Sequence, residues 1–262
     1  MHEGIYIAAS GAFKQERKLD IISNNLANLG NSGFKRDSLA FKEMIPPFTP
    51  AAAQAAAIDP RYAAFPQDQT VSYVGMTHFY TDPAQGSLRP TGNTLDLGLD
   101  GDGFLVVGTP QGVRYTRDGN LKLTPAGTLA TQEGFDVLGD NGTPIQIDAA
   151  GSIAIDANGA VSVGNGLQNT PVGNLKLAAF ADPSQLTKEG SGLFRTSDPA
   201  VKEQAPKDLY VRQGFLESSN VNSVGEMTEM ITTLRAFEAY QKIIQAIDQA
   251  DDQAVNSIGR LA

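Results

Sequence analysis

The sequence predicts an α+β protein in which a discontinuous α-helical coiled-coil domain, made from both ends of the chain, carries an inserted, mostly antiparallel all-β domain. Both ends of the 262-residue chain have long runs with helical hydrophobic spacing. The residues between them alternate short apolar runs with turn dipeptides. The expected parts are residues 1–40 with 215–262 as the terminal helical domain, 41–74 as a Pro/Ala-rich connector, and 75–214 as the all-β domain.

The first helix is expected over residues 4–28. Its apolar positions recur at alternating steps of three and four, which places them on one narrow stripe, as in a coiled coil. Gly30 and Gly33 follow, and such residues end a helix and let the chain turn sharply. The stripe consists of Ile5, Ala8, Ala12, Gln15, Leu19, Ile22 and Leu26.

The second helix is expected from Ser223, because Ser223 and Glu226 form a capping-box pattern and no proline interrupts the chain as far as Ile258. At 1.5 Å per residue this helix is about 50 Å long. Its apolar residues form two stripes that are offset by three residues, as a local stammer produces. The first stripe is Met227, Met230, Leu234 and Phe237, and the second is Tyr240, Ile243, Ile247, Ala250 and Ala254.

Neither helix can bury its stripe alone, so the two are expected to pair. The spacing is compatible with an antiparallel pair within one chain and with helices that also pack against other molecules. Residues 1–36 carry five Lys/Arg and three Asp/Glu, a net charge of +2, and residues 217–262 carry three and seven, a net charge of −4. These opposite charges favour association of the two ends, within a chain or between chains.

Composition excludes several classes of function. The net charge of −9 argues against nucleic-acid binding, which requires a basic stripe. The chain has no cysteine, so disulfides, cysteine-ligated metal and a thiol nucleophile are excluded. No stretch reaches the roughly 20 apolar residues of a membrane span, and the N-terminus lacks the pattern of a cleavable secretory signal. Export, if it occurs, is expected to use another route.

The middle of the chain has the spacing of an antiparallel β domain. Prolines surround the alanine-rich run at 51–57, which favours an irregular connector there. From Gly75 onward, dipeptides such as Asp100-Gly101, Asn141-Gly142 and Asn158-Gly159 separate short apolar runs, and these dipeptides suit tight hairpins. The expected strands include residues 104–107, 112–116, 121–123, 145–147, 153–155, 160–163 and 175–177.

No motif for catalysis or metal binding stands out, and we expect no enzyme, no cofactor and no metal. His2 and His78 have no metal-ligand spacing, and the Asp-rich turns lack a complete calcium loop. Two other classes of function remain open from the residues alone. One is a secreted, adhesin-like binding module with the helices as a stalk, and the other is a glycan hydrolase that uses carboxylates such as Asp96 and Asp102.

Two segments resemble signatures of a known family. Residues 23–36, SNNLANLGNSGFKR, are similar to the N-terminal signature of bacterial flagellar basal-body rod and hook proteins, although Asn31-Ser32 stands where Thr-Pro is usual before Gly33-Phe34. Residues 214–224, GFLESSNVNSV, resemble the entry to the family's C-terminal helix. Residues 92–104 and 115–119 are similar to its β domain. The resemblance covers nearly the whole chain and is weakest across residues 45–75.

The resemblance implies a structural subunit that needs no chemistry. Such a subunit packs helically with copies of itself and with other rod proteins, in the drive shaft that crosses the periplasm and transmits torque to the hook. It also implies export by the flagellar type III apparatus without a cleavable signal, and no membrane insertion. Residues 4–12, 91–93 and 255–260 look more like the proximal-rod branch, with its proximal neighbours and the distal rod protein as partners, than like the distal-rod branch.

The residues expected at the assembly interface combine stripe positions with signature positions. Asparagines near the end of the first helix and the start of the second are suited to hydrogen-bond backbone groups, either as simple caps or between molecules. The expected interface residues are Ile5, Ala12, Leu19, Ile22, Asn24, Asn25, Leu26, Asn28, Phe34, Asn220, Val221, Asn222, Met227, Leu234, Phe237, Ile243 and Ile247.

Overall fold

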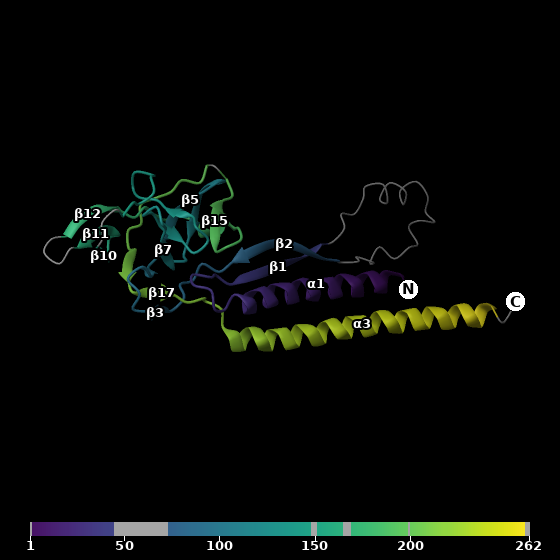
Figure 1. The fold of residues 1–262 in the computed structure, drawn as a ribbon. Helices are drawn as coiled ribbons and strands as arrows, with labels where there is room; N and C mark the ends of the chain where they lie inside the picture. The colour runs from purple at the N-terminus through teal and green to yellow at the C-terminus, as the bar shows by residue number, and fades with distance from the viewer. Residues whose placement is uncertain (1, 45–72, 148–150, 165–168, 199, 260–262) are drawn as a thin grey trace, which may run out of the picture. The chain divides into compact units, whose positions relative to one another are not determined.

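The computed structural model describes residues 2–44, 73–147, 151–164, 169–198 and 200–259. Most of the predicted connector, from residue 45 to residue 72, lies outside these described residues. Within them the predicted α+β class is confirmed, because a long helix stands at each end of the chain and antiparallel strands lie between the two in the sequence (Figure 1). No helix among the described residues has the length and hydropathy that a membrane crossing requires.

The chain divides into two compact units. Unit 1 contains the described residues of Met1–Asn24, Ser38–Tyr80 and Val224–Ala262, and unit 2 contains those of Asn25–Asp37 and Thr81–Ser223. Unit 2 therefore includes the segments that directly follow the first helix and precede the second.

The helices of unit 1 lie close to the predicted limits. α1 runs from His2 to Ala27 and α3 from Ser223 to Gly259. Three contacts define an antiparallel pair, which Figure 1 shows as two helices running beside each other. Gly4 lies beside Ile247, Gly11 lies against the ring of Tyr240, and Lys18 forms a 2.8 Å ion pair with Glu229. A Cβ atom at Gly11 would overlap that ring, so glycine allows the close approach of the two helices.

The stripe predicted on α1 is confirmed as the less accessible side of the helix. All seven of its members are buried or half-buried, with Ala8, Ala12 and Ile22 the least accessible. Tyr6 and Phe13 lie outside the stripe and are 64% and 44% exposed. The alternation of three and four residues therefore identified the packed face correctly, even though two large aromatic side chains lie elsewhere on the helix.

The predicted offset between two stripes on α3 is wrong. Most of the less accessible positions follow one unbroken series with steps of four and three: Glu226, Met230, Thr233, Phe237, Tyr240, Ile244 and Ile247, and the half-buried Glu229 and Ala236 adjoin it. Met227 and Leu234 were expected in the packed stripe, yet they are 54% and 46% exposed, and Ile243 is 47% exposed. The prediction followed the most apolar residues, whereas the helix buries Glu226 and Thr233 in the first part of that series.

The described strands are short, and every pairing whose register is defined is antiparallel. They are β1 (Asp37–Met44), β2 (Tyr73–Thr81), β3 (Leu88–Pro90), β4 (Leu97–Asp100), β5 (Phe104–Thr109), β6 (Gly112–Thr116), β7 (Leu121–Leu123), β8 (Leu129–Thr131), β9 (Asp136–Val137), β10 (Ser152–Ile155), β11 (Ala160–Gly164), β12 (Asn169–Asn174), β13 (Leu177–Ala178), β14 (Leu186–Lys188), β15 (Leu193–Thr196), β16 (Tyr210–Gln213) and β17 (Phe215–Glu217), with a 3₁₀ turn at Pro183–Gln185.

The largest sheet has the strand order β14-β15-β6-β5-β9-β8-β7, with β13 also paired to β5. Smaller sheets are β10-β11-β12, β16-β4, β17-β3 and, largely in unit 1, β1-β2. Five of the seven predicted strand segments form named strands. Residues 145–147 make one isolated bridge, through Gln146, and the predicted strand at 175–177 is reduced to β13 and a bridge at Leu175. β1 was not predicted.

The core of unit 2 lies on both sides of β5. Leu105 and Val107 belong to the larger apolar cluster, and Phe104 and Val106 belong to the second cluster. Successive side chains of a strand point to opposite faces, so a strand covered on both faces reads as a continuous apolar run. This explains why the sequence Phe-Leu-Val-Val lacks the alternation of a half-exposed strand.

Candidate functional site

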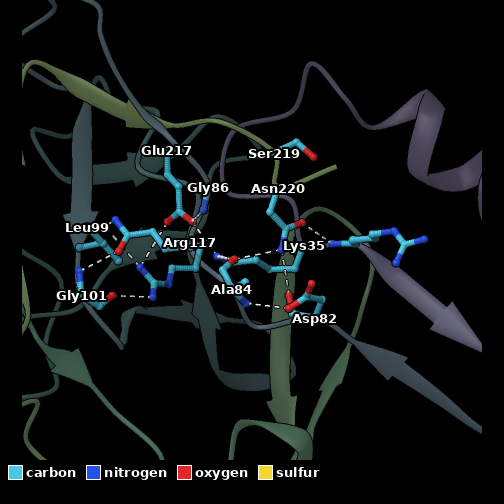
Figure 2. Close-up of polar contacts among 12 residues, drawn as sticks. Lys35, Asp82, Ala84, Gly86, Leu99, Gly101, Arg117, Glu217, Ser219 and Asn220 are labelled. Atoms are coloured by element: carbon cyan, nitrogen blue, oxygen red, sulfur yellow. Dashed lines mark hydrogen bonds and ion pairs between the residues drawn. The ribbon is translucent and has the colours of Figure 1, made fainter. Parts of the chain in front are cut away.

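The two signature segments, far apart in the sequence, meet inside unit 2. Asn220 connects them by hydrogen bonds that use its whole side-chain amide. Its Oδ1 accepts from the Arg36 backbone N–H at 2.7 Å, and its Nδ2 donates to the carbonyl oxygens of Asp82 and Ala84 at 3.1 and 2.9 Å. Its own backbone N–H donates to the Phe34 carbonyl at 3.3 Å. Figure 2 shows this side chain between the chain at Lys35 and the chain at Asp82 and Ala84.

The first signature is held by its own asparagine as well. Asn25 is fully buried, and its side chain pairs with the backbone of Asp37: Nδ2 donates to the Asp37 carbonyl and Oδ1 accepts from the Asp37 N–H, both at 2.9 Å. Asn28 accepts a 2.7 Å hydrogen bond from the side chain of Asn31. The prediction that asparagines bond backbone groups near the helix end is thus confirmed for Asn25 and Asn220, and both do so within one chain.

Gly33 allows the first signature to pack against the main chain of unit 2. Its φ of +67° lies in the left-handed region, and a Cβ atom there would overlap the carbonyl group of Arg117. Its N–H donates to the Glu217 carbonyl at 2.8 Å. Gly30, which we expected to share this role, has open space around it and no positive φ.

Three buried charged side chains lie at the same place. Glu217 accepts from Lys35 Nζ through Oε1 at 2.6 Å and from Arg117 Nη1 through Oε2 at 3.2 Å (Figure 2). Its Oε1 also accepts from the Gly86 N–H at 2.8 Å. The exposed fractions of the residues are 2% for Lys35, 3% for Arg117 and 1% for Glu217. We call these three residues the ion triad.

Carbonyl groups complete the surroundings of both cations. Lys35 Nζ donates to the Ala84 carbonyl at 2.8 Å, and Arg117 Nη2 donates to the Gly101 carbonyl at 2.6 Å. Arg117 Nε is buried and has no hydrogen-bond partner among the described residues, and the guanidinium lies 5.5 Å from the Phe104 ring centroid. Burial lowers the pKa values of Lys35 and Arg117, while the Glu217 carboxylate opposes both shifts.

A third cation, Lys188, supports the same segment. Lys188 Nζ donates to the Lys35 carbonyl at 2.8 Å and to Asp37 Oδ2 at 2.9 Å, and it lies 3.5 Å from the ring centroid of Phe34. Burial lowers the pKa of Lys188, and its hydrogen bond to Asp37 acts in the opposite direction. Phe34 is itself buried, so its ring serves the packing of unit 2.

The predicted interface residues fall into three groups of accessibility. Ala12, Ile22, Asn25, Phe34 and Val221 are buried. Ile5, Leu19, Leu26, Asn28, Asn220, Phe237 and Ile247 are half-buried. Asn24, Asn222, Met227, Leu234 and Ile243 are exposed.

An apolar stripe lies on the exposed side of the first three turns of α3. Val224, Met227, Ile231 and Leu234 follow steps of three and four and are 72%, 54%, 55% and 46% exposed. These four residues are called the outer stripe. The next position in the series is the exposed Glu238, so the stripe ends there.

Sequence reasoning missed Lys35, Arg117 and Glu217 as a group. The residues stand inside the quoted signatures, but the contact between Lys35 and Glu217 spans 182 positions, and no local spacing announces it. The acidic candidates for other chemistry have ordinary structural contacts. Asp96, considered for glycan hydrolysis, is 5% exposed and accepts from Asn93 Nδ2. In one of the Asp-rich turns, Asp156 Oδ1 accepts from the backbone N–H groups of Asn158 and Ala160. No cluster of three potential metal ligands occurs in the described part of the chain.

Long terminal helices, an apolar stripe open to contact and a joint made largely of hydrogen bonds between side chains and backbone groups are features of a structural subunit. The comparisons identify its family. The N-terminal segment, residues 5–35, matches the model for flagella basal body rod protein. Residues 98–163 match the flagellar hook protein FlgE/F/G D1 domain, and residues 212–257 match the C-terminal model of flagellar basal body rod FlgEFG proteins.

Curated relatives extend this similarity over the whole chain. The chain is 36% identical to the flagellar basal-body rod protein FlgG of Bacillus subtilis, over 98% of this chain and 99% of the relative. It is 33% identical to the flagellar basal-body rod protein FlgF of Caulobacter vibrioides over the full length of both, and 33% identical to the FlgF of Salmonella typhimurium over 97% of both. The chain therefore belongs to the flagellar basal-body rod protein family. It is a structural rod subunit and not an enzyme.

Proposed function

We propose that this chain is a proximal rod subunit whose two terminal helices form a coiled coil and pack against the helices of neighbouring subunits. The outer stripe of α3 carries the proposal, because four large apolar side chains in helical register stay 46–72% exposed in the single chain. A contiguous apolar face of this kind is typical of an interaction surface. Burying it in an assembly contributes about 1 kcal/mol per side chain, or about 4 kcal/mol per subunit.

The proposed interface includes all the residues that the sequence suggested, with different roles. The exposed members, such as Met227, Leu234 and Ile243, supply direct contacts between subunits. The buried members, such as Ile22, Phe34 and Val221, hold the helices and the signature joint in shape. A contact between one face of a subunit and a different face of the next one repeats without closing, which produces a helical assembly.

The proposed partners are copies of this chain, its neighbours in the proximal rod and the distal rod protein. In this role the chain crosses the periplasm as part of the drive shaft and transmits torque to the hook. We also propose export through the flagellar export apparatus without a cleavable signal. We retain the predicted division into residues 1–40 with 215–262, 41–74 and 75–214 as the working limits of its helical, connecting and β parts.

The distal rod is the second candidate position, because the 36% identity to a FlgG protein supports it. The features of residues 4–12, 91–93 and 255–260 favour the proximal position. Complementation separates the two positions. We expect the chain to restore swimming in a strain that lacks its FlgF and not in one that lacks its FlgG. The opposite result would assign it to the distal rod.

The interface is tested by changing Met227 and Leu234 together to glutamine. Both side chains are already half exposed, so the thermal unfolding temperature of the isolated protein should change by no more than about 2 °C, whereas swimming should be lost. Glu238→Gln, at the next position of the same face, is the matched control and should swim normally. Normal swimming by the double variant would rule out the outer stripe as a subunit contact.

A further inference from the structure

We propose that the ion triad is a latch that fastens the first and last segments of unit 2 to each other, with Glu217 as the residue on which the fastening depends. Lys35 belongs to the segment after α1, Glu217 to β17 near the end of the unit, and Arg117 follows β6 in the middle. These contacts lie within unit 2, so the latch closes in a single chain.

The charge balance of the triad gives Glu217 its special position. Two buried cations share one carboxylate, and each of its oxygens holds one of them. Removing Lys35 leaves a neutral pair of Arg117 and Glu217. Removing the negative charge of Glu217 leaves two cations without the carboxylate that they share, and both residues are at most 3% exposed. Leaving a buried charge without its partner destabilises the folded state far more than replacing a complete ion pair by apolar groups does.

Glu217 also joins the two segments through hydrogen bonds to backbone groups. Its carbonyl accepts from the Gly33 N–H, and its Oε1 accepts from the Gly86 N–H, both at 2.8 Å. A Cβ atom at Gly86 would overlap the carbonyl of Ser218, so the chain at Gly86 lies directly against the residue after Glu217. Displacement of Glu217 therefore loosens residues 33, 86 and 217 together.

The latch uses no residue of the two apolar clusters, and it contacts them through Arg117, whose guanidinium lies 5.5 Å from the Phe104 ring centroid and whose Nη1 donates to the Leu99 carbonyl at 3.4 Å. Neither cluster contains Lys35 or Glu217, and Leu105 and Val107 in β5 and Leu129 in β8 of the large sheet are completely buried. Local elements of a protein can open with less free energy than the whole structure. Loss of the latch should thus release the two terminal segments of unit 2 while the large sheet stays closed.

Amide hydrogen exchange of the full-length chain tests the latch residue by residue. The variants are Glu217→Gln and Lys35→Met, with Arg212→Gln as a control that removes the exposed ion pair between Arg212 and Asp100 in the same unit. In Glu217→Gln we expect the amides of Gly33 and Gly86 to lose roughly a hundredfold of their protection, since breaking a buried pair exposes its partners.

The amides of Leu129 and Leu138 donate to the carbonyls of Ile145 and Val106 within the sheet region. Their protection should change by less than about threefold in Glu217→Gln. Lys35→Met should also reduce the protection of the Gly86 amide, but by a factor at least tenfold smaller than Glu217→Gln does. The reason is that the neutral pair of Arg117 and Glu217 remains. Arg212→Gln should leave all four amides unchanged.

Two results for Glu217→Gln would overturn the latch. In the first, the amides of Leu129 and Leu138 lose as much protection as those of Gly33 and Gly86. In the second, none of these four amides changes. If Glu217→Gln does not fold, Lys35→Met decides the question: retained protection at Gly86 supports the charge argument, and loss of folding in this variant too refutes it.

Discussion

The carboxyl group of Asp118 should destabilise the folded protein at neutral pH, and replacing it by asparagine should increase stability. Asp118 is half-buried, and burial raises the pKa of its carboxyl to about 6 from an ordinary value of 3.8. The backbone N–H of Asn120, which donates to Asp118 Oδ1 at 3.0 Å, opposes the shift, whereas Glu133 and Asp96 add to it. The folded state therefore prefers the protonated form more than the unfolded chain does.

The sign of the pH effect follows from proton binding. Between pH 3.8 and about 6 the folded state binds more protons at Asp118 than the unfolded state does, so stability falls as the pH rises through this range. Above about pH 6 the loss is complete. The shift from 3.8 to about 6 corresponds to an upper limit of about 3 kcal/mol at 1.36 kcal/mol per unit. Because the carboxyl keeps some contact with water, we expect about 2 kcal/mol.

Urea unfolding of Asp118→Asn at several pH values measures this contribution. Asparagine is neutral, and its Oδ1 can accept the Asn120 N–H in place of the carboxylate. At pH 7.5 the variant should be more stable than the natural protein by about 2 kcal/mol, and the difference should shrink toward zero near pH 4. Asp140→Asn, at an exposed carboxyl, is the control and should show no such pH-dependent gain. A difference that stays constant from pH 4.5 to 7.5, or a loss of stability at pH 7.5, would refute the reasoning.

Two further predictions concern the segment after α1. Gly33→Ala should lower the free energy of unfolding of unit 2 by about 2–4 kcal/mol in urea, because Gly33 has a positive φ and an added Cβ atom would overlap Arg117. Gly30→Ala is the control and should lower it by less than about 1 kcal/mol. Limited proteolysis of the isolated monomer should cut within residues 2–24 and 224–259, where the helix pair opens in the absence of neighbouring subunits, and should spare residues 25–37, which unit 2 holds. Early cuts within 25–37, or full resistance of both helices, would contradict this prediction.

The first and last residues of both helices were predicted to within two residues, because the hydrophobic period and the terminating glycines are local signals in the sequence. Most strands were found for the same reason: turn dipeptides separate them. β1 was missed because the sequence DSLAFKEM has charged residues at both ends and no clear alternation. Neither periodicity nor turn chemistry shows that β1 pairs with β2, which lies beyond the connector.

The joint of the two signatures was only partly predictable. The resemblance drew attention to Asn25 and Asn220, and hydrogen-bonding capacity suggested contacts to backbone groups. Which backbone groups they reach depends on the fold, since Asn220 bonds residues 36, 82 and 84. Arg117 and Glu217 gave no local signal. Charged residues are ordinarily exposed, and the sequence alone does not show that two of them are buried and share one site.

The misassigned stripe of α3 bears directly on function. In the first three turns the less accessible side carries the polar Glu226 and Thr233, while the exposed outer stripe is entirely apolar. A helix that only had to pair with α1 would show the opposite distribution, with its apolar residues inside. The free energy available from this part of α3 is therefore greater for contact with another molecule than for contact within the chain. On this argument the helix pair gains much of its stability on assembly. The two helices, and not the segments held by unit 2, should therefore be open to proteases in the monomer.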